Sequence, residues 1–370
     1  MEFGLTEFQQ MISNSSDEFL AQECQMAFVR DMELDTRGCT DEFWAQIVGQ
    51  GWTGIGIPEE YGGTGGDFLD LAVLIENTGK YLMPGPLFST VILAGMTILD
   101  AGSNSQKSDW LPRISDGSLL ATMAFVEQSG SYEWEDIATQ ATLSDEKYII
   151  SGTKLFVPYA HISELIIIPA RTSDTGITLF AVDSAMDGLD IQPMDLMSCD
   201  KNSSVTLDGV KVDASAIIGQ IDCGGEMFSR AFIRAVIAKC IQMTGSLTSC
   251  LDLTLGYVKQ RSQFGRSIAT FQAIQHHCSN MAIDLEGSRH VAYQAAWALA
   301  TGIDPDRYAH MAKAWLNEST QRISVLAHQS HGAIGFTHDY DLQMHTRWLK
   351  SQELLYGNNH YHKEKYLNIG

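Results

Sequence analysis

One proline-free stretch of helical character dominates the last third of the chain. Residues 228–261 form a run of 34 residues without proline, about three times the length of an average globular helix. Two further stretches, 271–300 and 306–332, repeat the helical spacing of apolar residues. Helices of this length bury their apolar faces by lying antiparallel against one another, so we predict a four-helix bundle here.

The rest of the chain shows two different sequence patterns. Residues before about 118 show helical spacing, interrupted by the glycine-rich loop Ile55–Gly66, which is expected to turn sharply or to approach another segment closely. Short β-rich runs follow, separated by Gly, Asp, Ser and Asn, as is typical of a sandwich or barrel. We therefore predict an α+β chain of three domains: an all-helical N-terminal domain (1–118), a middle β domain (119–219) and a C-terminal helical bundle (220–370).

The charge balance excludes several classes of partner. The chain has 24 Lys plus Arg against 45 Asp plus Glu, a formal net charge of −21. Nucleic acids and anionic membrane surfaces need clustered cations, and no such cluster appears in the sequence. We expect no nucleic-acid or membrane partner, and any phosphate-bearing ligand must be held by a few placed cations and backbone N–H groups.

The cysteines and histidines do not predict a metal site. Seven widely spread cysteines include no Cys-x-x-Cys pair, which is typical of reduced thiols. The adjacent His276 and His277 would point about 100° apart on a helix and do not suit one ion. The chain also starts without the features of a signal peptide, and we expect a cytoplasmic protein.

The segment Gln260–His277 is the most informative motif. Arg261 closes the first long helix, Phe264 lies in the turn, and Gln272 opens the next helix. A guanidinium can fork two N–H groups onto phosphate oxygens, so Arg261 is a candidate diphosphate ligand. The alternative is an ordinary turn between helices with a solvated arginine.

This segment closely resembles the helix hairpin of the acyl-CoA dehydrogenase flavoproteins. Four other segments resemble motifs of the same family in the same order. They are 57–63, 124–127, 152–157 and 329–336.

The resemblance implies a tetramer that binds FAD at contacts between subunits. Phe125 and Val126 would lie against the flavin, and Phe156, with Val157 and Pro158, would lie beside its ring system. Arg261, Phe264 and Gln272 would hold the diphosphate. Gln329, Gly332 and Ala333 would contact FAD from a neighbouring subunit.

The family's reaction is the α,β-dehydrogenation of an acyl-CoA thioester, with electrons passed to an electron-transfer flavoprotein. Its base is usually a glutamate followed by glycine, at a position that falls here on Tyr356. The other known base position falls on Ala235. Tyrosine is a weak base at neutral pH, so Tyr356 is expected to shape the pocket while its backbone N–H faces the thioester oxygen.

Other carboxylates are weak candidates for the base. Asp339, Asp341 and Glu353 are interpreted as mostly solvated, and Glu127 as structural. Two flavin contacts also depart from the family pattern, because Pro158 lacks an N–H and Val126 replaces a common threonine. Backbone N–H groups remain available, so FAD binding is still expected.

Several functions remain open. The chain could be a homotetrameric enzyme with a relocated base, or one subunit of a heterotetramer whose paralogous partner supplies the base, acting on a bulky, branched or ring-containing acyl group. A flavin-dependent monooxygenase of the same fold needs no such base. A catalytically silent partner subunit would retain only the fold.

Overall fold

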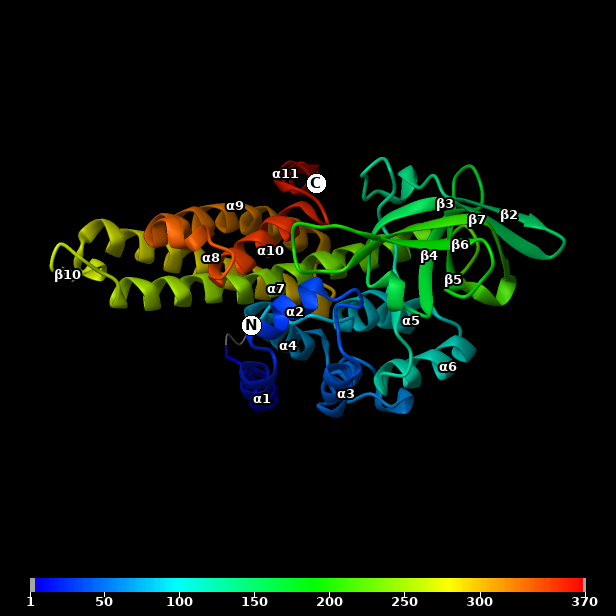
Figure 1. Ribbon diagram of the computed structural model, residues 1–370. Coiled ribbons are helices and arrows are strands. Elements are labelled where there is room, and N and C mark those ends of the chain that lie inside the picture. The colour runs from blue at the N-terminus through cyan, green and yellow to red at the C-terminus, as the bar shows by residue number, and fades with distance from the viewer. Residues whose placement is uncertain (1–3, 369–370) are drawn as a thin grey trace.

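The computed structural model describes residues 4–368 and contains three parts in chain order (Figure 1). Helices form the first part, strands the second, and a long helical bundle the third, which extends away from the sheet. The predicted α+β architecture is therefore confirmed.

The N-terminal part is helical, and polar side chains fix where several of its helices begin. Thr6, Asp67 and Ser103 each form a capping box with the residue three positions later. Its elements are α1 (Glu7–Glu23), α2 (Met26–Leu34), α3 (Asp41–Gly49), α4 (Phe68–Lys80), the π-helix η3 (Phe88–Gly95), α5 (Met96–Ala101) and α6 (Asn104–Ser115).

The glycine-rich loop between α3 and α4 folds back on itself, as its composition predicted. A Cβ at Gly63 would lie 2.0 Å from the carbonyl oxygen of Ile57, so only glycine allows this approach.

The middle part is one curled sheet around its own apolar core. Its strand order is β6-β7-β3-β2-β4-β5-β8, and β1 pairs in parallel with β4. The strands are β1 (Ala121–Met123), β2 (Gln140–Ser144), β3 (Lys147–Pro158), β4 (Leu165–Arg171), β5 (Ile177–Asp183), β6 (Leu189–Met194), β7 (Asn202–Asp213) and β8 (Ile217–Ile218). The sequence did not predict β6, whose Pro193 is tolerated because β6 is an edge strand.

The C-terminal part is the predicted bundle of long helices. In it α7 packs against α8, α9 and α10, and also against α4 of the N-terminal part. The elements are α7 (Gly224–Gln260), α8 (Gln272–Thr301), α9 (Pro305–His331), α10 (Leu342–Leu354) and α11 (Asn359–Asn368), with a small hairpin of β9 (Ser262–Gln263) and β10 (Arg266–Ser267) at the far end.

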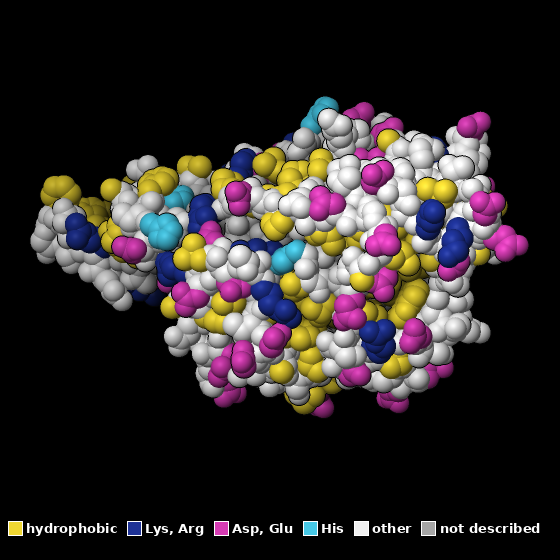
Figure 2. Space-filling model, turned by 45° about the vertical axis from the view of Figure 1, so that its right-hand side comes forward, with side chains coloured by type: hydrophobic (Ala, Val, Ile, Leu, Met, Phe, Trp, Pro, Cys, Tyr) yellow, Lys and Arg dark blue, Asp and Glu magenta, His cyan; other side chains and the backbone are white. Residues whose placement is uncertain are grey.

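The surface reflects the acidic composition. Figure 2 shows Asp and Glu side chains spread over the wide end of the molecule rather than gathered in one patch. Across residues 4–368, no helix combines the length and the apolar character needed to cross a membrane. The same residues contain no group of three His, Cys, Asp or Glu side chains that would suit a metal ion.

Candidate active site

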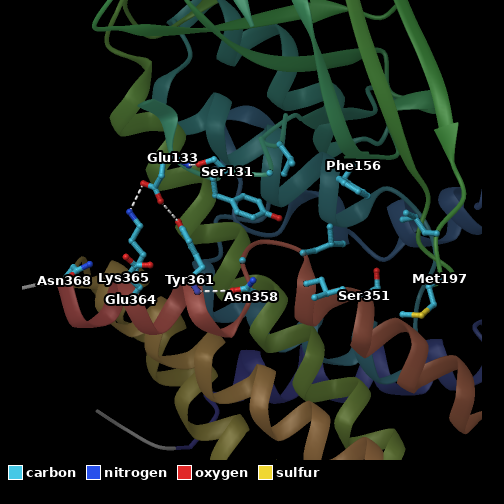
Figure 3. A pocket seen from close by; sticks show the side chains of 17 residues that line it. Ser131, Glu133, Phe156, Met197, Ser351, Asn358, Tyr361, Glu364, Lys365 and Asn368 are labelled. Carbon is cyan, nitrogen blue, oxygen red and sulfur yellow. Dashed lines mark hydrogen bonds and ion pairs between the residues drawn. The ribbon is translucent and has the colours of Figure 1, made fainter. Parts of the chain in front are cut away.

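A cavity of about 750 Å³ lies between the β domain and the helices α10 and α11 (Figure 3). One end is apolar and the other carries charge. Phe156, Met197 and Leu354 line the apolar end, and Glu133, Glu364 and Lys365 line the charged end.

Two residues expected to contact the flavin line this cavity, and local backbone geometry positions both. The Leu155 N–H donates to the Val126 carbonyl oxygen at 2.8 Å, which joins their two segments. A bulge in the pairing of β3 with β7 lets Phe156 adopt a φ of +54°, and its side chain is 37% exposed. Val126 and Leu155 thereby form an isolated antiparallel bridge.

A buried ion pair holds these two segments together. The Lys154 ammonium lies 2.6 Å from the Glu127 carboxylate, which also accepts hydrogen bonds from the Thr139 hydroxyl and the Ala138 N–H. Burial lowers the pKa of Lys154 to about 8, against the opposing effect of Glu127. Burial also disfavours the charge on Glu127, but Lys154 and the hydrogen bonds outweigh it and lower the pKa of that carboxyl. The network gives Glu127 the structural role expected of it.

The other predicted residues of this segment do not line the cavity. Val157 is fully buried in the core of the β domain, so its side chain faces away. Pro158 pairs with Asn202 at the end of β3. Phe125 packs edge-on against Phe228 on α7, at a ring separation of 5.2 Å. Val157, Pro158 and Phe125 could therefore support FAD binding only with their backbone groups or by packing behind the residues that line the cavity.

Tyr356 lies in an aromatic cluster instead of facing open solvent. Its ring centroid is 6.1–6.4 Å from those of Phe88, Phe125, Tyr132 and Phe232. Burial raises the pKa of its hydroxyl well above the ordinary value, which disfavours a phenolate base.

The Tyr356 backbone N–H has a hydrogen-bond partner within the chain. This N–H was expected to face a thioester oxygen, but it donates to the Tyr132 hydroxyl oxygen at 2.7 Å. Sequence reasoning missed Tyr132, although it follows the flavin-facing segment 124–127 by only five residues.

The weaker base candidates also lie away from the cavity. Glu353 was expected to be solvated, but it is buried and pairs with Lys350 at 3.0 Å. Asp341 pairs with Arg30 at 2.7 Å, and Asp339 is exposed. Ala235 is fully buried in α7. Glu133 and Glu364 are the carboxylates that line the cavity among residues 4–368.

The charged end of the cavity is closed by contacts between the β domain and α11. The Tyr361 hydroxyl donates to Glu133 at 2.9 Å, and the Lys365 ammonium pairs with the same carboxylate at 2.7 Å. Glu133 is thereby engaged by two partners, so it is a poor candidate for a free catalytic base.

The predicted diphosphate ligands lie at the far end of the bundle. Arg261 caps α7, Phe264 is 93% exposed in the hairpin, and Gln272 begins α8. The segment after α9 lies at the same end, because the His331 ring stacks on Tyr257 of α7 at 4.6 Å. Gln329 is exposed near the C-terminal end of α9, and Gly332 and Ala333 are exposed in the segment that follows the helix.

The cavity and the hairpin are too far apart to share one cofactor within one chain. Phe232 lies in the aromatic cluster by the cavity, and Arg261 is 29 residues further along the same straight element. At 1.5 Å per residue this separation is about 43 Å. The hairpin residues Arg261, Phe264 and Gln272 therefore do not reach the cavity of their own chain.

Models of one family match nearly the whole chain. The acyl-CoA dehydrogenase N-terminal domain matches residues 6–118, the middle domain residues 122–210 and the C-terminal domain residues 224–366. The chain belongs to the acyl-CoA dehydrogenase family. Several of its relatives are oxidoreductases named for acyl-CoA substrates, and members of the family are FAD-binding flavoproteins.

Individual proteins support this membership. The chain is 30% identical to the 3-(aryl)acrylate reductase of Clostridium sporogenes, over 91% of this chain and 92% of that protein. The solved structure of butyryl-CoA dehydrogenase from Megasphaera elsdenii is 25% identical and superposes with a TM-score of 0.92, covering 99% of this chain and 98% of that one. A variant of the Tcur3481-Tcur3483 steroid ACAD is 27% identical, with a TM-score of 0.89 over 98% and 97% of the two chains.

Proposed function

We propose that this chain is one subunit of a heteromeric, FAD-dependent acyl-CoA dehydrogenase whose paralogous partner supplies the catalytic carboxylate. The observation that carries the proposal is the environment of Tyr356. A buried tyrosine with a raised pKa occupies the usual base position, and its N–H is already bound to Tyr132. Because this chain has no carboxylate at the usual base position, a second chain must remove the substrate's α-proton.

The residues present suit FAD in two separate groups. At the cavity, Val126 lines the wall on which the flavin edge would lie, and the Phe156 ring offers a face for packing. At the hairpin, Arg261 suits a diphosphate and the amides of Gln272 and Gln329 suit its neighbouring oxygens. Because the hairpin group extends away from its own cavity, we assign it to the cofactor bound in a partner's cavity.

The reaction we propose is the α,β-dehydrogenation of an acyl-CoA thioester. The partner's carboxylate would take the α-proton, bound FAD would supply the hydride acceptor for the β-hydrogen, and a C=C bond would form between the two carbons. Similarity to a steroid ACAD supports a bulky, ring-containing or branched acyl group. An electron-transfer flavoprotein is the proposed acceptor, and the cytoplasm is the proposed location.

Co-expression with paralogous chains tests this proposal. The purified chain and each complex are assayed with a panel of acyl-CoA thioesters and a ferrocenium acceptor. We expect turnover from a complex and none from this chain alone, and we expect a Glu→Gln change at the partner's base to abolish turnover. Robust dehydrogenation by the homo-oligomer would overturn the proposal in favour of a homotetramer with a relocated base.

The same preparations distinguish the remaining alternatives. A flavin-dependent monooxygenase would consume oxygen with added reduced flavin and would show no acyl-CoA oxidation. A silent scaffold would leave the partner fully active without this chain's hairpin residues. Either result would contradict the proposed function.

A further inference from the structure

The turn at Tyr356 and Gly357 has the geometry of an oxyanion-binding site. Both residues have positive φ angles, +59° and +99°. Successive backbone N–H groups in such a turn converge on one concave point, where they bind an anion or a polarised carbonyl oxygen. The oxygen at this point is the hydroxyl oxygen of Tyr132, which accepts the Tyr356 N–H at 2.7 Å. The N–H groups of Tyr356 and Gly357 both oppose the burial that raises the pKa of this hydroxyl to about 12.

The turn is held from behind by groups that do not involve Tyr132. The Tyr356 carbonyl oxygen accepts a hydrogen bond from His362 Nε2 at 2.8 Å. The fully buried Lys313 ammonium donates to the carbonyl oxygens of Gln352 at 2.8 Å and Gly357 at 3.4 Å. These contacts fix the direction of the two N–H groups, so the site would stay formed if the tyrosine moved away.

Tyr132 is itself held in place by its own segment. The neighbouring Glu133 is bound to Tyr361 and Lys365 of α11. The Tyr132 ring also packs against Phe232 and Tyr361, with centroids 4.9 Å and 6.1 Å away. The hydroxyl is therefore presented to the turn by the contacts that close the charged end of the cavity.

We propose that Tyr132 is an internal competitor for the carbonyl oxygen of an acyl thioester and closes this chain's own cavity to acyl-CoA. The inference rests on the proposed function and deepens it, because it assigns acyl-CoA binding to the partner's cavity. One pair of converging N–H groups accommodates one oxygen at hydrogen-bonding distance, so a thioester must displace the tyrosine. The charged end of the cavity works in the same direction, because it carries the two carboxylates of Glu133 and Glu364 against the one ammonium of Lys365, and this excess of negative charge disfavours the phosphates of CoA.

Binding of benzoyl-CoA to the purified full-length chain tests the inference directly. Benzoyl-CoA carries a ring and has no α-hydrogen, so binding is measured by calorimetry without turnover. Tyr132→Ala removes both hydroxyl and ring and is expected to tighten binding at least tenfold. Tyr132→Phe removes the competing oxygen but leaves the ring, and it is expected to give a smaller gain. Tyr366→Ala is the control, because Tyr366 lies on α11 outside the cavity, and it should leave the affinity unchanged.

Two results would overturn the inference. One is no gain in affinity in Tyr132→Ala while circular dichroism shows the variant to be folded, and the other is an equal gain in the Tyr366→Ala control. Calorimetry on the complex separates this inference from the proposed function. If the complex turns over substrate but Tyr132→Ala adds no second benzoyl-CoA site, only the competitor role fails. If this chain alone dehydrogenates acyl-CoA, the proposed function fails as well.

Discussion

Lys154 and Glu127 form the buried ion pair on which the cavity's flavin-facing wall depends. Their side chains are 0% and 7% exposed and lie 2.6 Å apart. Because removing one partner leaves a buried charge uncompensated, Lys154→Met should lower the free energy of unfolding by about 3–5 kcal/mol. Urea denaturation measures this loss. The double variant Glu127→Gln, Lys154→Met should recover part of it, and a single-variant loss below about 1 kcal/mol would contradict the buried pair.

The Tyr356 hydroxyl is expected to be dispensable for catalysis. Burial holds it protonated, so Tyr356→Phe should change the turnover of the complex by no more than a few-fold. A phenolate base would instead be worth about 10²–10⁴ in rate. The pH profile of kcat/KM in both forms checks the result, because a phenolate base would add an acidic limb that the phenylalanine variant lacks.

At the residue scale, short motifs were predictable and contacts distant in sequence were not. Val126 and Phe156 were found because each lies within a compact motif, and both line the cavity. The bond between Tyr132 and the Tyr356 N–H joins residues 224 positions apart. No local pattern encodes such a pairing, since it depends on how the loop after β1 docks on the end of the bundle.

At the scale of elements, two glycines set how closely α4 and α7 cross. A Cβ at Gly245 would lie 1.8 Å from the Glu76 carbonyl oxygen, and one at Gly79 would lie 1.8 Å from that of Gln242. Gly245→Ala should therefore cost about 3 kcal/mol or more, because the backbones must separate. Gly256→Ala is the matched control on the same helix, with no atom within 4 Å of the new Cβ. Gly256→Ala should stabilise the helix by up to about 1 kcal/mol. Urea denaturation measures both variants. Equal effects of the two changes on the free energy of unfolding would contradict the close crossing of α4 and α7.

The thiols inside α7 make stability fall at alkaline pH. Cys240 and Cys250 are fully buried, and burial raises the pKa of each thiol from about 9 to about 12. Between these values the unfolded chain releases both protons and the folded chain keeps them. The free energy of unfolding should therefore decrease with rising pH, by up to about 1.4 kcal/mol per unit for each thiol. Denaturant titrations from pH 8 to 10.5 measure this effect. The free energy of unfolding should decrease less steeply with pH in the double variant Cys240→Ala, Cys250→Ala than in the wild type. An identical slope in the two proteins would count against this assignment.

Elements with a strong repeating pattern were predictable from the sequence. The helix α7 spans Gly224–Gln260 and contains the predicted stretch 228–261 except for its last residue, because apolar spacing persists without proline. The edge strand β6 was not predicted, because its Pro193 and its half-exposed pattern do not resemble a buried strand. Its place in the sheet is decided by pairing with β7, which is a tertiary effect.

At the scale of the whole molecule, the two groups of candidate FAD ligands lie at opposite ends of α7. In the proposed complex, this arrangement makes FAD a ligand of two chains rather than of one. Each motif is local and was therefore recognisable, whereas the proposed site joins motifs of two chains, which no single sequence encodes.

Arg261 provides the test of this arrangement. Its exposed guanidinium caps α7 about 43 Å from the aromatic cluster at its own cavity. Arg261→Ala removes a charge-assisted contact worth roughly 1.5–3 kcal/mol, so the complex should hold FAD about tenfold or more weakly and lose turnover at low FAD. Arg307→Ala changes the net charge equally at the other end of the bundle, where Arg307 lies near the Tyr366 ring, and it should leave FAD affinity unchanged. Fluorescence titration of apo-complexes with FAD measures both variants. If Arg261→Ala binds FAD as tightly as the wild type, the hairpin of this chain does not hold the cofactor.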